Sequence, residues 1–281
     1  MSRDQLAGDR EASAEGGPEG VGAPDEPATP GPVLFARYAY PPNSLGYCGP
    51  SDPAALLEAA SDGPDLDGLG RLAARFEGAW PYLQLIAACN GISDPLDARV
   101  VEAYWVGNEL VDRVSAPALA ASLSDRFQQP AIQLLESSMS AAPAGGVPQH
   151  SLHVFAVYPW LRLLRSGKKG PALEVLDRCR IRWGHVEAVT GDLVTVRSQV
   201  LSFDGSRLAL GAERVEQARC SLDGVGPAIE LRPGDTVSLH WDWVCDRLSP
   251  AALSWLQDCT LRNLAAVDAP PMPDPAVERE A

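Results

Sequence analysis

Apolar side chains return every three to four residues over a long central stretch of the chain. Between about residues 52 and 176 they follow the i, i+3, i+4, i+7 spacing that gives a helix one apolar face. The clearest run comprises Leu69, Leu72, Ala73, Phe76, Trp80 and Leu83. We therefore predict an N-terminal, all-α helical domain over residues 32–176.

At about residue 178 the apolar period changes from 3.6 to 2, the period of half-buried strands. Asp204-Gly205 lies between two such segments and is a strong hairpin signal, because a type I′ turn needs positive φ at its central residues. Several short antiparallel strands predict a small β-barrel within residues 177–267, closed by a helix that starts at Ser249-Pro250. The predicted fold class is α+β. The predicted strand positions are Ile181 and Trp183, 193–200, Leu208 and Leu210, and Val237, Leu239, Trp241 and Trp243.

Both ends of the chain lack this apolar patterning. Residues 1–31 are rich in Gly, Ala, Pro and Glu, and residues 268–281 contain four prolines. Neither segment can bury enough apolar surface to offset the entropy of ordering, so both are predicted to be disordered tails, the first of them acidic.

Composition and charge narrow the choice of partner and compartment. A formal net charge of −14 opposes binding to a phosphate backbone, so nucleic acid is not an expected partner. The chain has no uninterrupted apolar run of about 18 residues, and no membrane span or export is expected. Six cysteines without a Cys-x-x-Cys pair favour a reducing, cytoplasmic location over a disulfide framework.

Cys179 and His240 are the residues whose local context best suits a metal ligand. Arg178, Arg180 and Arg182 flank the cysteine, and their positive charge would lower the pKa of the thiol and favour the thiolate. Alternation along the strand that contains His240 places Val237, Leu239, Trp241 and Trp243 on the core face and Ser238, His240 and Asp242 on the opposite face. His240 is therefore predicted to point away from the core.

Two sequence elements around these residues resemble the HypC/HupF family of small [NiFe]-hydrogenase maturation chaperones. That family begins with Met-Cys-x-x-x-Pro-Gly-x-Val, and here Cys179-Arg180-Ile181-Arg182-Trp183-Gly184-His185-Val186 is similar, with Trp183 in place of the proline. The family pattern Gly-Asp-x-Val-x-x-His is matched by Gly234-Asp235-Thr236-Val237-Ser238-Leu239-His240. The resemblance covers residues 178 to 267, about a third of the chain, and implies that the predicted barrel is a small, OB-like antiparallel β-barrel followed by a C-terminal helix.

The resemblance implies a non-catalytic accessory protein or chaperone of hydrogenase maturation or assembly. Cys179 and His240 would then hold an iron that carries cyanide and carbon monoxide, Fe(CN)2CO. A soft thiolate and a neutral imidazole suit such an iron. The implied partners are the hydrogenase large-subunit precursor and a HypD-like maturation scaffold. The candidate partner-binding residues are Arg180, Arg182, Trp183, Gly184, Asp235 and Cys48.

Three further groups of residues could carry chemistry. Cys48 lies in the Pro- and Tyr-rich segment 38–50, which we interpret as a loop that either exposes this thiol or packs over the core. His150 and His153 have a His-x-x-His spacing of about one helical turn, which suits a metal but more commonly flanks a buried helix. Trp105, Asn108, Glu109 and Asp112 would share one helical face, where such carboxylates are usually solvated.

Two alternative functions remain open at this point. The first is a metal-free, OB-like module that binds a protein or small ligand and has no connection with hydrogenase, because small barrels host many functions. The second is a cysteine-dependent enzyme that uses Cys48 or Cys179 with a histidine base, although no orienting third group is recognisable.

Overall fold

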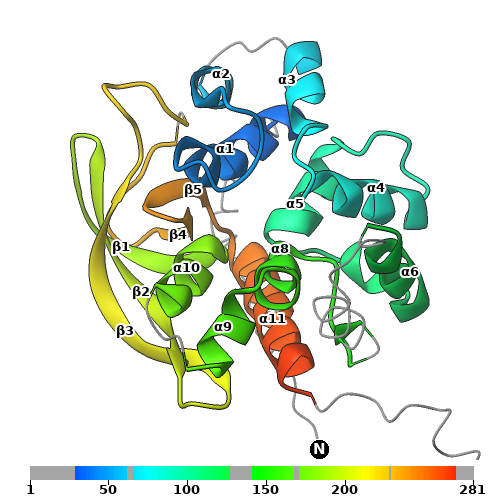
Figure 1. Cartoon of the computed structure of the whole chain (residues 1–281). Coiled ribbons are helices and arrows are strands. Elements are labelled where there is room, and N and C mark those ends of the chain that lie inside the picture. The colour runs from blue at the N-terminus through cyan, green and yellow to red at the C-terminus, as the bar shows by residue number, and fades with distance from the viewer. Residues whose placement is uncertain are drawn as a thin grey trace, which may run out of the picture.

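The computed structural model describes residues 29–61, 66–126, 141–142, 144–167, 171–227 and 229–269. Within these residues a helical part precedes a five-stranded sheet, and a long helix follows the sheet (Figure 1). This mixed α+β order confirms the predicted fold class. The tails predicted for residues 1–31 and 268–281 lie almost entirely outside the described residues.

The helical part consists mainly of short helices. Its α-helices are α1 (Gly31–Ser44), α2 (Pro53–Ala60), α3 (Leu66–Ala73), α4 (Trp80–Cys89), α5 (Ala98–Trp105), α6 (Ala116–Arg126), α8 (His150–Leu152), α9 (Trp160–Arg165) and α10 (Ala172–Cys179). A 3-10 turn, η1 (Val111–Arg113), follows α5, and a π-helical turn, η2 (His153–Val157), continues α8.

The strands are β1 (Arg182–Thr190), β2 (Leu193–Phe203), β3 (Leu208–Arg219), β4 (Thr236–His240) and β5 (Trp243–Arg247). They are hydrogen-bonded in the closed order β1-β2-β3-β5-β4, with β4 returning to β1. All neighbours are antiparallel except β3 and β5, which meet in parallel where Arg219 lies opposite Trp243. Seven buried apolar residues fill the interior, among them Val194, Val237 and Leu239.

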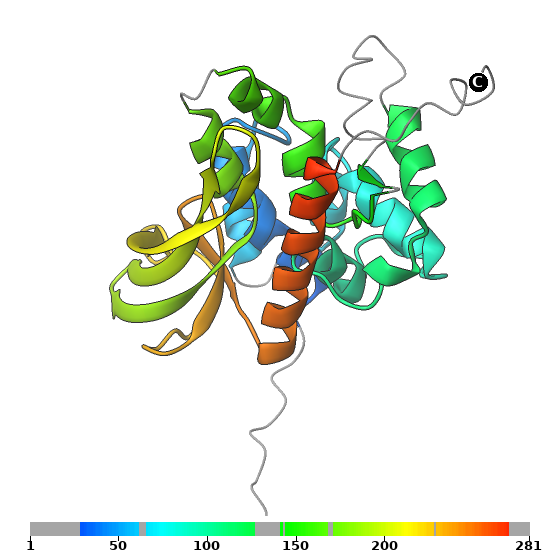
Figure 2. The same cartoon turned by 90° about the horizontal axis from the view of Figure 1, so that it is seen from below.

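Helices cover one side of this closed sheet. α1 contacts β4 and β5, α10 contacts β2, and α11 (Pro250–Asp268) contacts both β3 and α8. Figure 2 shows α11 between the strands on one side and α4 and α6 on the other. The largest cluster of buried apolar side chains runs from α1 through α5 to α11 and includes Trp183 and Trp243 of the strands, so the two parts share a core.

Several sequence-based expectations are confirmed. Ser249 caps α11, because its hydroxyl accepts the backbone N–H of Ala252 at 3.1 Å. The hairpin at Asp204-Gly205 joins β2 to β3, but its connection has four residues, and the Asp204 side chain accepts the backbone N–H groups of Ser206 and Arg207 at 2.8 Å. The side chain thus replaces part of the hydrogen bonding that a two-residue turn would supply.

Two local predictions are wrong. Residues 38–44 form the last turns of α1 rather than a loop, and Pro41 and Pro42 lie inside the helix. The strand predicted from Val237 to Trp243 is broken at Trp241, which has a φ of 55° in the turn between β4 and β5. A tryptophan in this left-handed region is unusual and marks a backbone that the surrounding packing enforces.

No helix within the described ranges is both long enough and apolar enough to span a bilayer.

Gly107, in the turn after α5, is a position where we expect an added methyl group to be costly. Its φ is 110°, and a Cβ there would lie 2.7 Å from the Sγ of Cys259 on α11. We expect Gly107→Ala to lower the free energy of unfolding by about 2–4 kcal/mol, through backbone strain together with overpacking. Urea-induced unfolding measures the loss.

Gly91 provides the matched control for this substitution. Its φ of 66° is also positive, but a Cβ there meets no atom within 4 Å. Gly91→Ala should therefore cost only the backbone strain, about 1 kcal/mol. Equal losses for the two variants would contradict the close packing of the turn after α5 against α11.

Candidate metal centre

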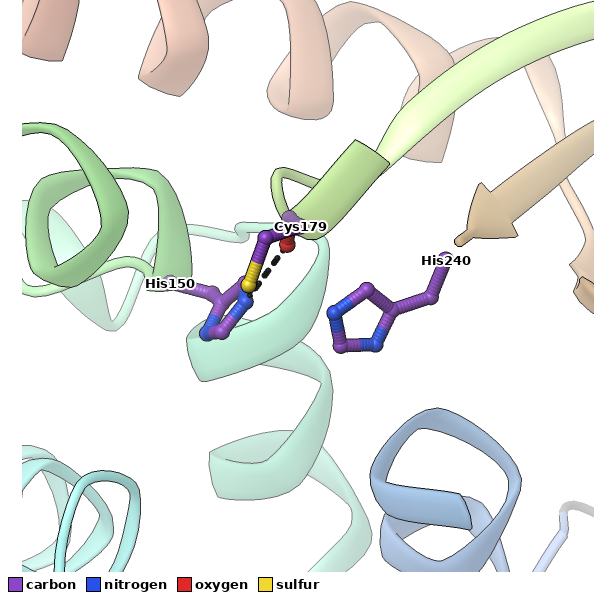
Figure 3. A group of neighbouring side chains, drawn as sticks. All are labelled: His150, Cys179 and His240. Carbon is purple, nitrogen blue, oxygen red and sulfur yellow. Dashed lines mark hydrogen bonds between the residues drawn. The ribbon is translucent and has the colours of Figure 1, made fainter. Parts of the chain in front are cut away.

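Three buried side chains converge between the barrel and the helices: His150, Cys179 and His240. One ligand atom from each lies within 4.8 Å of the other two. Figure 3 shows His240 reaching inward from the end of β4, while His150 and Cys179 approach from α8 and the end of α10. The structure therefore brings together the two residues predicted as metal ligands and adds a third.

The pairing of β1 with β4 explains why Cys179 and His240 meet. Arg182 pairs with Leu239, and the antiparallel ladder continues to His185 opposite Thr236. The residues just before β1 consequently lie beside the last residue of β4. The N–H of Trp241 also donates to the carbonyl of Arg178 at 2.7 Å, which holds the end of α10 against the turn after β4.

His240 is oriented by a backbone carbonyl of α1. Its Nδ1 lies 2.6 Å from the Tyr38 oxygen, and because a carbonyl can only accept, Nδ1 carries the hydrogen. The other nitrogen, Nε2, is buried and has no hydrogen-bond partner among the described residues. Histidines that bind metals usually donate their second nitrogen to a carbonyl or carboxylate in this way.

Two prolines leave the Tyr38 carbonyl free for this role. In a helix the carbonyl of residue 38 would accept the N–H of residue 42, or of residue 41 in a tighter turn. Both positions are proline and have no N–H to donate. Pro41 and Pro42 therefore help to orient His240, because they leave the Tyr38 carbonyl available to accept its hydrogen bond. The prediction of a loop did not reveal this role.

The burial of His240 corrects the prediction that it points away from the core. Val237, Ser238, Leu239 and His240 are all fully buried. Alternation assigned the two faces of β4 correctly, since Val237 and Leu239 fill the barrel interior. Helix α1 covers the opposite face of β4, so the residues on that face are not exposed either. The Ser238 hydroxyl, for example, lies 2.8 Å from the Tyr38 hydroxyl.

His150 is held by hydrogen bonds through both ring nitrogens. Its Nε2 lies 2.9 Å from the Cys179 carbonyl and must donate to it, so Nδ1 accepts the Tyr104 hydroxyl at 3.1 Å. The start of α8 is anchored by Gln149, whose side chain donates to the Trp105 carbonyl and accepts the N–H of Ser151, each at 2.8 Å. His150 is therefore a well-positioned neighbour of the thiol.

Trp105 forms the wall behind both imidazoles. Its ring centroid lies 4.7 Å from that of His150 and 5.6 Å from that of His240. The predicted helical face of Trp105, Asn108, Glu109 and Asp112 does not exist, because α5 ends at Trp105 and Gly107 turns the chain. The sequence offered no signal that the tryptophan contacts the site, because its partners come from distant segments.

Burial sets the protonation of the three groups. It lowers the pKa of His150 to about 4 and that of His240 well below its ordinary value, so both rings are neutral near pH 7. Burial also raises the pKa of the Cys179 thiol. The arginines that were predicted to lower it do not do so: Arg178, Arg180 and Arg182 are paired with Glu174, Asp177 and Glu216, respectively.

The structure places most of the predicted partner-binding residues inside the protein. Arg180 and Arg182 are fully buried, and Trp183 and Gly184 are buried on β1, so they present no surface to a partner. The Arg180 and Arg182 side chains instead form ion pairs inside the protein, with Asp177 and Glu216. Asp235 is half-buried, and its carboxylate accepts the N–H of Arg232 at 2.7 Å within the turn before β4.

Cys48 and His153 border the cluster without joining it. Cys48 follows α1 in a half-buried loop, and burial raises its pKa to about 12, so it is not the exposed thiol that one interpretation required. His153 is buried, with its ring 4.7 Å from that of Tyr158 and 5.7 Å from that of Tyr82. The His-x-x-His pair thus contributes only His150 to the cluster.

The donor set of the cluster fits a transition metal. One thiolate and two neutral imidazoles suit Zn²⁺, Co²⁺, Cu or Fe, whereas Mg²⁺ and Ca²⁺ prefer oxygen ligands. Ligand atoms around one ion lie about 3.5 Å apart, so the three groups, which lie within 4.8 Å of one another, would have to close by at most about 1 Å. The free Nε2 of His240 is ready for this, while His150 would have to give up one of its two hydrogen bonds, that with the Cys179 carbonyl or that with the Tyr104 hydroxyl.

The low pKa of His150 predicts a loss of stability in mild acid for the metal-free protein. The His150 pKa shifts from 6.5 to about 4, which corresponds to about 3 kcal/mol in the free energy of unfolding, at about 1.4 kcal/mol per pKa unit. Because the unfolded chain binds this proton first, the free energy of unfolding should fall as the pH falls from about 6.5 to 4. Denaturant unfolding at several pH values, with and without His150→Gln, measures this slope. Identical slopes would contradict a buried, neutral His150.

Comparison with known proteins places the whole described architecture in one family. No curated protein and no solved structure matches the chain. A family model with the description "Family of unknown function (DUF6390)" matches residues 27–272, which include α1, the cluster, the closed sheet and α11. Since this match spans most of the 281 residues, the protein belongs to the DUF6390 family, whose function is unknown.

Proposed function

We propose that this protein holds a transition metal between Cys179, His240 and His150 and serves as a non-catalytic accessory protein. The observation that carries the proposal is the buried Nε2 of His240, which has no partner in the described structure and lies within 4.8 Å of the other ligand atoms. Leaving a buried polar nitrogen unpaired costs free energy, and a bound metal would remove that cost.

The finer role that we propose is in [NiFe]-hydrogenase maturation or assembly, with the metal an iron that carries cyanide and carbon monoxide. Support comes from the two sequence elements that resemble HypC/HupF, which pair as β1 and β4 and thereby bring Cys179 beside His240. The closed strand order 1-2-3-5-4, with β3 and β5 parallel, is the order expected of an OB-like barrel.

The position of Cys179 determines how this protein would differ from the small chaperones. In that family the cysteine is the second residue and lies on a free arm. Here it ends α10 and is buried. The protein would therefore hold the metal unit internally while it binds the large-subunit precursor or a HypD-like scaffold in the cytoplasm. Passing the unit on would require the end of α10 to open.

The decisive experiment is to purify the tagged protein from its native host under anaerobic, hydrogenase-inducing conditions. Infrared bands of cyanide and carbonyl that disappear in Cys179→Ala but persist in His185→Ala would support an iron carrier. Mass spectrometry of the co-purified proteins identifies the partner. A preparation with neither metal nor hydrogenase proteins would refute both parts of the proposal.

A metal-free binding module is the second candidate. The observation that favours it is the pair of hydrogen bonds that already occupies both nitrogens of His150. In that case the cluster would be structural, and the protein would act through a ligand or a partner bound elsewhere. Wild-type protein that stays metal-free on isolation and does not bind added Co²⁺ would favour this candidate.

A further inference from the structure

An apolar cavity lies directly beside the cluster. Its volume is about 210 Å³, and its walls come from the loop after α1, the start of α4, α5, the η2 segment and α10. His150 and Cys179 form part of its wall, whereas His240 does not. The cavity therefore reaches the cluster from one side only.

Aromatic rings and uncharged groups line the cavity. Its wall includes Tyr47, Phe76, Tyr104, Trp105, Tyr158 and Trp160. Among the described residues that form it there is no Asp, Glu, Lys or Arg. A charged ligand would lose its hydration there without compensation.

The loop that carries Cys48 is held firmly over the cavity. The side-chain amide of Asn43 donates to the carbonyls of Cys48 and Pro50 at 2.7 and 2.6 Å. A Cβ at Gly49 would lie 2.4 Å from the Phe76 ring, so the backbone packs directly on that side chain. The cavity wall is thus built by specific contacts and is not a chance gap between helices.

The cavity also has a route to the outside. A larger groove of about 850 Å³ lies next to it and shares Tyr47, Cys48, Gly78, His153 and Tyr158 with its wall. Tyr47 is 45% exposed and stacks on Trp241 with the ring centroids 4.4 Å apart. A small molecule could enter from the groove past this tyrosine.

We propose that this cavity binds a small, uncharged aromatic molecule with one hydrogen-bonding group. Apolar cavities of about 150 Å³ accept benzene, so 210 Å³ accommodates a ring with one or two substituents. The aromatic wall favours a planar ring, and the Tyr158 hydroxyl and the thiols of Cys48 and Cys179 supply hydrogen-bonding partners. This inference does not require a metal in the cluster.

Phenol and benzoate are the probes that test the proposal. Titration of the metal-free, full-length protein, followed by calorimetry and by ligand-observed NMR, should show saturable phenol binding with a dissociation constant of about 1 mM or tighter. Benzoate has a ring of the same size but carries a charge, and should not bind at the same concentrations. Absence of saturable phenol binding, or equal binding of the two probes, would overturn the proposal.

Two substitutions that fill the cavity tie phenol binding to this location. Val175→Phe on α10 and Ala79→Leu at the start of α4 add volume to the cavity wall from two different elements and should weaken phenol binding at least tenfold. Leu173→Phe, on α10 but outside the cavity wall, is the matched control and should bind phenol as the wild type does. Unchanged phenol binding in both folded cavity variants would place the site elsewhere and overturn the assignment.

His240→Ala separates this proposal from the metal proposal. Since His240 is absent from the cavity wall, the variant should keep its affinity for phenol while it loses the metal. Wild-type protein that binds phenol but no metal would refute only the metal centre, and wild-type protein that binds metal but no phenol would refute only the cavity site.

Discussion

Replacing His240 by alanine is expected to weaken Co²⁺ binding by about 100-fold or more. The substitution removes the one ligand whose free nitrogen already faces the cluster and whose tautomer the Tyr38 carbonyl selects. Loss of a supporting residue around a metal costs 10- to about 100-fold in affinity, so loss of a ligand should cost at least as much. Titration of metal-free protein with Co²⁺, followed by its absorption spectrum, measures the change.

His185→Ala is the matched control for this experiment. His185 is exposed on β1, and its Nδ1 lies 3.1 Å from the Thr236 hydroxyl, away from the cluster. Its loss should leave Co²⁺ affinity unchanged. Cys179→Ser should abolish the thiolate-to-cobalt charge-transfer band, because only a coordinated thiolate produces it. If His240→Ala and His185→Ala bound Co²⁺ equally well, the cluster would not be the metal site.

Arg182→Ala should lower the free energy of unfolding by about 3–5 kcal/mol, the largest effect on stability that we expect. Arg182 is fully buried, forms an ion pair with Glu216, and donates to the carbonyl of Trp241. Its removal would leave the largely buried Glu216 carboxylate with Ser198 and Arg214 as partners and would open a cavity. Unfolding in guanidinium chloride measures the loss.

Arg197→Ala is the surface counterpart of that change. Arg197 on β2 pairs with Glu187 at 2.5 Å, but its side chain is 46% exposed, so the substitution should cost less than about 1 kcal/mol. Arg182→Met keeps much of the buried volume and separates the loss of charge from the loss of packing. Similar, small losses for Arg182→Ala and Arg197→Ala would show that the buried pair does not stabilise the barrel.

The candidate site was partly predictable from the sequence. Cys179 and His240 stood out because each lies in a short pattern with recognisable neighbours, and strand pairing then brings the two patterns together. His150 was visible only as half of a His-x-x-His spacing, which gave no reason to separate it from His153. The two histidines differ because α8 and η2 direct them to different neighbours, Cys179 for one and Tyr158 for the other.

The errors in the sequence-based interpretation also have physical causes. Tyrosines and prolines between residues 38 and 50 suggested a loop, yet α1 continues to Ser44 although Pro41 and Pro42 lack the N–H of a helical hydrogen bond. The Tyr38 carbonyl that this leaves without a helical partner accepts a hydrogen bond from His240. The arginines around Cys179 suggested a lowered thiol pKa. Their charges are instead satisfied by Glu174, Asp177 and Glu216, so burial dominates the pKa.

Local pattern in the sequence determined the order of helices and strands, the hairpin between β2 and β3, the capped start of α11 and the two residues at the centre of the candidate site. These features depend on side-chain period and on contacts between near neighbours, which a sequence displays directly. Tertiary structure alone decided that both faces of β4 are buried, that the Tyr38 carbonyl orients His240, and that an uncharged cavity borders the cluster. Each of these depends on residues far apart in the chain, such as Tyr38 and His240, whose meeting no local period encodes.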